Sequence, residues 1–133
     1  MTATAYTLGT TTNLDHDAAV EVARAALAAE GFGVLCTIDV QATMKAKLDI
    51  DRPPYTILGA CNPPLAHQAL TAEPEIGALL PCNVVVYEHE GTTRVSAIDA
   101  GRMLSIVERE DLAPIANEVR TRLERVISAI PAS

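Results

Sequence analysis

The chain has 133 residues, which is most simply a single domain spanning residues 1–133. Apolar residues make up 49% of it, yet it has one Phe, three Tyr and no Trp, and 17 acidic against 10 basic residues give a net charge of −7. Nucleic-acid binders usually carry basic patches and aromatic side chains for stacking, so this composition argues against DNA, RNA and anionic membranes as partners.

The N-terminus lacks the basic start and continuous apolar run of a signal peptide, and no segment approaches the roughly 20 apolar residues of a membrane span. We therefore expect a soluble, cytoplasmic protein. The three cysteines are an odd number, and in a reducing compartment a structural disulfide framework is not expected. The sequence has no Cys-x-x-Cys or His-x-x-x-His pair and no glycine-rich phosphate loop, so it predicts no metal site and identifies no cofactor.

The first part of the chain predicts a strand, a helix and a second strand. Residues 3–9 are rich in Thr and contain a Tyr, which favours an edge strand. Asn13 is expected to cap a helix of about 15 residues, because acidic residues fill its first turn and Gly31 stands at its C′ position. Residues 32–38 are apolar and β-branched and predict a strand with Cys36 in the core.

The middle of the chain predicts a helix, a strand and another helix. Asp39 is expected to cap a short helix over residues 40–48, which must end before Pro53 because a proline pushes its predecessor out of the α region. Residues 55–60 resume as a strand. Pro63 fits the first position of the next helix, with Asn62 as its N-cap.

The last part predicts a hairpin and a long helix. Residues 83–87 and 93–98 form its two strands, joined by a turn over residues 88–91. Asp111 is expected to cap a helix over residues 112–130, whose apolar residues form one stripe. His16 and His89 are expected to be exposed, and Asp99 is read as a turn former.

Helices and strands are mixed, but a tight hairpin joins two strands and no regular βαβ alternation occurs. This pattern is typical of the α+β class, and it predicts a mainly antiparallel sheet with helices packed on it.

The candidate site lies at two Cys-Asn pairs, Cys61-Asn62 and Cys82-Asn83. Cys61 precedes a helix N-terminus, which favours the thiolate form of a cysteine, and His67 follows within that helix as a candidate proton partner. If the strands flanking this helix are neighbours, the two pairs could meet as a polar patch. The alternative is structural, because free cysteine packs well as a small apolar residue and Asn often caps a helix or closes a turn.

The same segments carry a family resemblance. The motifs GFGVL at 31–35, ILGACNPPLAHQAL at 57–70, EPEIGALLPCNVVVYE at 73–88 and SAID at 96–99 resemble the bacterial and archaeal domain-of-unknown-function family 302. The resemblance implies an α+β domain with a TATA-box-binding-protein-like arrangement that self-associates, and it supplies no reaction. Gly101 departs from the family, whose members tend to have a proline soon after the aspartate of SAID.

Several hypotheses for function remain open. The first is a non-catalytic, small-ligand-binding or regulatory homodimer with Cys61, Asn62, His67, Cys82 and Asn83 at its site. The second is a thiol-dependent enzyme or redox protein, in which Cys61 is the reactive thiolate, His67 its proton partner and Cys82 a resolving thiol. A soft-metal site on Cys61, Cys82 and His67 ranks last, because their spacing matches no known zinc or copper motif. A purely structural oligomerisation module is the remaining alternative.

Overall fold

One antiparallel sheet of six strands organises the structure, a computed structural model that describes residues 1–133. The strands lie side by side in the order β1-β2-β6-β5-β4-β3, and each neighbouring pair is antiparallel. Their bounds are β1 Thr2–Ala3, β2 Thr7–Thr12, β3 Gly33–Asp39, β4 Tyr55–Cys61, β5 Cys82–His89 and β6 Thr92–Ile98. The α+β class predicted from the sequence is confirmed.

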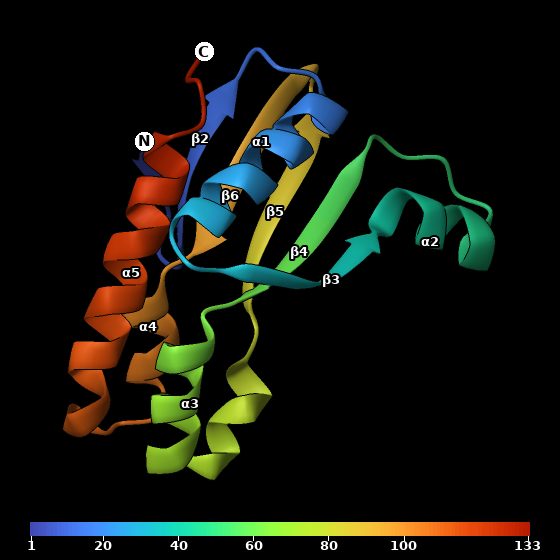
Figure 1. Cartoon of the computed structure of the whole chain (residues 1–133). Helices are drawn as coiled ribbons and strands as arrows, with labels where there is room; N and C mark the ends of the chain where they lie inside the picture. Colours follow the sequence, from blue (N-terminus) through green and yellow to red (C-terminus); the bar gives the residue numbers. More distant parts are fainter.

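The helices divide into three groups around this sheet (Figure 1). α1 and α5 pack on the sheet, and α3 and α4 lie at one of its ends. α2 projects beyond the edge of the sheet that β3 forms. Their bounds are α1 His16–Ala29, α2 Val40–Leu48, α3 Pro63–Ala72, α4 Ala100–Ser105 and α5 Ala113–Ser128, with 3₁₀ turns η1 Pro74–Leu79 and η2 Glu110–Leu112. None of these helices combines the length and hydrophobicity that a membrane span requires.

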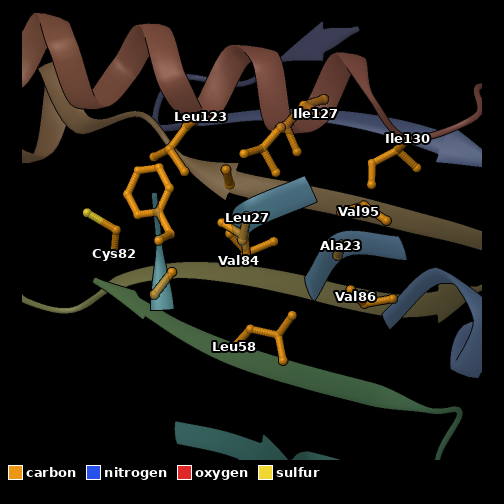
Figure 2. Packing of buried hydrophobic residues seen from close by; sticks show 14 of the residues in the cluster. Ala23, Leu27, Leu58, Cys82, Val84, Val86, Val95, Leu123, Ile127 and Ile130 are labelled. Atoms are coloured by element: carbon orange, nitrogen blue, oxygen red, sulfur yellow. The ribbon is translucent and has the colours of Figure 1, made fainter. Parts of the chain in front are cut away.

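The main core lies between the sheet and the pair α1 and α5. Successive side chains of a strand point to opposite faces, so alternate residues of β5 and β6, such as Val84 and Val95, face the helices. Leu27 of α1 and Leu123 of α5 meet them from above, and all four side chains are fully buried (Figure 2). The remaining strand positions face the other side of the sheet, which we call the open face.

Local signals predict several element ends correctly. The Asp39 carboxylate accepts a hydrogen bond from the Ala42 N–H at 2.9 Å, and α2 spans the predicted residues. Gly31 follows α1 with φ of 82°, a conformation that costs glycine little. The two-residue turn Glu90-Gly91 closes the predicted hairpin, and both residues have positive φ as a type I′ turn requires.

Other predicted ends are wrong. Asp15, not Asn13, caps α1 by accepting from the Ala18 N–H at 2.8 Å. Asp111 caps no helix, because its carboxylate is paired with the guanidinium of Arg109 and α5 begins after it. The first long strand is Thr7–Thr12 rather than residues 3–9, since it takes its register from β6.

Two further polar residues have roles that the sequence did not predict. His16 is half-buried rather than exposed, because its Nε2 lies 2.9 Å from the Thr56 hydroxyl. Asp99 does more than form a turn: its carboxylate accepts from the N–H groups of Gly101 and Arg102 and so caps α4, a helix that sequence reasoning missed.

The prediction of a buried Cys36 is also wrong. Cys36 is exposed, and its neighbours Leu35 and Ile38 are 68% and 45% exposed. β3 is an edge strand with a register shift between Val34 and Cys36, so apolar residues there are left without a covering layer. We call β3, α2 and the loop that follows, residues 33–54, the arm.

Candidate functional site

A cavity of about 310 Å³ opens at the end of the sheet where β4 and β5 meet α3. Of its 17 lining residues, 14 are hydrophobic. The lining residues come from the segment before β3, β3, β4, α3, η1, the start of β5, α4 and α5, and include Phe32, Leu65, Leu80, Met103 and Ile115. The cavity is therefore an apolar chamber whose walls come from segments far apart in the sequence.

Both thiols of the predicted site line this cavity. Ala60 and Cys82 are direct partners in the β4–β5 ladder, so Cys61 lies one residue beyond that pair at the strand end. Cys61 is half-buried and Cys82 is buried. The Leu80–Pro81 peptide bond before β5 is cis.

Asn62 lines the same wall of the cavity as the two thiols, and it also caps α3. Its side-chain oxygen accepts a hydrogen bond from the Leu65 N–H at 3.3 Å, and Pro63 occupies the first position of α3. The predicted N-cap is confirmed. Asn62 is buried, so its amide is a polar group held at a mostly apolar surface.

The environment of Cys82 keeps its thiol neutral. Burial, and to a lesser extent the nearby Cys61, raise the pKa of Cys82 to about 11. At neutral pH Cys82 is consequently a small apolar thiol rather than a nucleophile.

The chain is similar to known proteins in both sequence and structure. The family model described as domain of unknown function DUF302 matches residues 8–130. The chain belongs to the DUF302 family. A crystal structure of an uncharacterized conserved DUF302 protein from Bacillus stearothermophilus is similar to it, with a TM-score of 0.88 and 27% sequence identity over 95% of this chain and 98% of that one. No match was found among curated proteins.

The other two predicted site residues of this DUF302 domain lie away from the cavity. His67 is on the exposed side of α3 and does not line the chamber. Asn83 points to the open face, where it borders a different cavity, because it neighbours Cys82 on a strand and alternation sends it the other way. The two Cys-Asn pairs thus meet through Cys61, Asn62 and Cys82 alone.

No group of three or more His, Cys, Asp or Glu residues is arranged to hold a metal ion. Cys61 and Cys82 lack a third ligand at the chamber because His67 lies outside it.

Sequence reasoning missed the apolar walls of the chamber. Met103 and Ile115 lie in segments that pack against η1 and α3 only after the chain has folded, and nothing local marks them as pocket residues. A sequence signal exists only in α3, where the small residues Ala66 and Ala69 leave space that a larger side chain would fill.

Proposed function

We propose that this DUF302 domain is a non-catalytic binding protein that holds a small apolar molecule in the chamber beside Cys61 and Cys82. The observation that carries the proposal is the cavity of about 310 Å³ with 14 hydrophobic residues among the 17 that line it. Ligand pockets are typically concave and mostly apolar, with a few polar groups that fix orientation. Here the polar group is the Asn62 amide, and the two thiols, counted among the 14, are weak hydrogen-bond donors.

The thiol-enzyme alternative is less well supported by the geometry. A nucleophilic cysteine needs a base within hydrogen-bond reach, and His67 lies outside the chamber that Cys61 lines. A resolving cysteine reacts as the thiolate, whereas burial raises the pKa of Cys82 to about 11. The thiols are better suited to contacting an apolar ligand than to exchanging electrons.

Self-association through the arm is a further part of the proposal, with a second copy of this chain as the partner. α2 has nine residues and none of them is buried, and helices of that length are marginal without packing. The arm also exposes Leu35, Ile38, Leu48 and Ile50. Large apolar side chains exposed within one segment are typical of an interface, so a homodimer would supply the missing cover.

The chamber is tested by titration with N-phenyl-1-naphthylamine, a neutral fluorescent probe. Ala66 is half-buried and lines the chamber, so Ala66→Phe should fill it and weaken binding about tenfold or more. His67→Phe adds the same ring to the exposed side of the same helix and should leave binding unchanged. Equal affinity in both variants, or no saturable binding to the parent protein, would overturn the proposal.

Self-association is tested by light scattering after gel filtration. The parent chain of 14.1 kDa should elute with the mass of two copies. Ile38→Glu places a charge within the arm and should give the monomer mass, whereas Ile106→Glu, at a 69% exposed residue outside the arm, should remain dimeric. A monomeric parent protein would rule out this part of the proposal.

A further inference from the structure

A second cavity, of about 450 Å³, lies on the open face of the sheet. Its ten lining residues come from β2, β4, β5, β6 and the segment before β2, and none of them lines the apolar chamber. Three are tyrosines and only one is charged, Arg94. No carboxylate borders the cavity, although the chain as a whole carries a net charge of −7.

Arg94 is half-buried, and its guanidinium has no acidic partner. Its Nη1 donates to the Thr2 hydroxyl at 2.9 Å, and no Asp or Glu lies within salt-bridge distance. By contrast, Arg109, Arg120, Arg122 and Arg125 are each paired with a carboxylate. An arginine presents five donors in a planar fork that matches a carboxylate, so Arg94 has donors left for an anion.

The sheet is shaped to hold that guanidinium beside an unpartnered hydroxyl. Gly9 and Ser96 are direct partners on β2 and β6, and a Cβ on Gly9 would come within 2.8 Å of Arg94 Nη2. The missing side chain therefore leaves the hollow that Arg94 enters. Ser96 also lines this cavity; it is 5% exposed, and its hydroxyl oxygen is buried and has no hydrogen-bond partner. A buried hydroxyl without a partner is costly, and a bound ligand could satisfy it.

An aromatic wall stands next to Arg94. Tyr87 is its direct partner across the β5–β6 ladder, and the Tyr87 ring stacks on Tyr55 with centroids 5.1 Å apart and planes 17° apart. Burial, and next the neighbouring Tyr87, raise the pKa of Tyr55, so its phenol remains a neutral donor. Val85 and Ile98 complete an apolar floor between the polar groups.

We infer that the open-face cavity binds a small aromatic carboxylate, held by the Arg94 guanidinium and the Ser96 hydroxyl with its ring against the tyrosine wall. The single guanidinium matches the single charge of a carboxylate, and the rings and aliphatic floor match a planar apolar body. This site is independent of the apolar chamber and of the function proposed for it.

The test is a titration of the ¹⁵N-labelled full chain with sodium benzoate at constant ionic strength, followed by amide chemical shifts. Benzoate should give saturable shifts at Tyr87, Arg94 and Ser96. Benzyl alcohol, with the same ring and no charge, and inorganic phosphate, with charge and no ring, should each bind about tenfold more weakly or worse, the equivalent of losing one charge-assisted hydrogen bond.

Arg94→Gln should reduce benzoate affinity to that of benzyl alcohol, while Arg102→Gln, at an exposed arginine that does not line the cavity, should leave it unchanged. Arg94→Lys keeps the charge without the fork and should fall between them, which preserves the test if the Gln variant folds poorly. The inference is overturned if benzoate shifts map to the apolar chamber, if Arg94→Gln binds like the parent, if phosphate binds best, or if the variant alters self-association but not benzoate binding.

Discussion

The helix-covered core and the arm contain the same residue types at opposite exposures. Leu27 and Leu58 are fully buried between sheet and helices, whereas Leu35 and Leu48 in the arm are 68% and 61% exposed. Both regions have clear sequence patterns for secondary structure: a capped helix, a strand and an apolar run. The comparison shows that periodicity specifies which residues share a face, while burial depends on whether another element lies over that face.

The largest contrast should appear in stability. Leu58→Ala removes methyl groups from a filled core and should lower the free energy of unfolding by about 2–5 kcal/mol. Leu48→Ala on the arm should change the free energy of unfolding of the monomer by less than about 0.5 kcal/mol, because that side chain is largely exposed. Urea denaturation at low protein concentration measures both, and similar losses would contradict the division.

Buried Cys82 and exposed Cys36 should differ in how they affect the pH dependence of stability. Since burial raises the pKa of Cys82 to about 11 in the folded protein, the folded state keeps a proton that the unfolded chain loses first. The associated stability, about 2–3 kcal/mol, is fully present below pH 8.5 and lost as pH rises toward 11. Denaturation across this range should show a steeper fall in the parent than in Cys82→Ala. Exposed Cys36→Ala should retain the parent slope, and parallel curves for all three proteins would refute the effect.

Substituting Asn62 and substituting Asn83 should lower the free energy of unfolding by different amounts, and the difference should be about the contribution of one helix N-cap. Asn62→Ala removes the acceptor for the Leu65 N–H and should cost about 1 kcal/mol. Asn83→Ala, at an exposed position on the open face, should cost little. Thermal unfolding of both variants checks this, and equal losses would mean that the cap does not stabilise α3.

The three cysteines should also differ in their rates of alkylation by iodoacetamide, which mass spectrometry measures for each residue. Cys36 on the arm is exposed, Cys61 at the chamber is half-buried and Cys82 is buried. Accessibility therefore predicts reaction in the order Cys36, Cys61, Cys82. Rapid modification of Cys61 ahead of exposed Cys36 would instead favour the thiol-enzyme alternative.

Local chemistry explains what could be predicted from the sequence. Asp39 and Asn62 cap their helices as expected, because a side-chain oxygen satisfies N–H groups a few residues away. The hairpin turn and the end of α1 likewise depend on Gly91 and Gly31, whose positive φ is a conformation that glycine adopts at little cost.

What could not be predicted depends on distant segments. Cys36 is exposed because no helix covers the arm, and His67 lies outside the chamber because the rotation of α3 is set by its packing partners. The chamber itself needs Met103 and Ile115 beside Leu65, which only the folded chain provides. For the same reason the sequence did not predict the open-face cavity, since Tyr55 lies on β4 whereas Arg94 and Ser96 lie on β6.

The most direct test of the central claim, ligand binding in the apolar chamber, is a set of intermolecular NOEs between N-phenyl-1-naphthylamine and methyl groups of the full chain. We expect contacts to the methyls of Leu65, Leu80 and Ile115, which line the chamber. Contacts only to arm residues such as Ile38 or Leu48, or no contacts from a bound probe to the chamber, would contradict it.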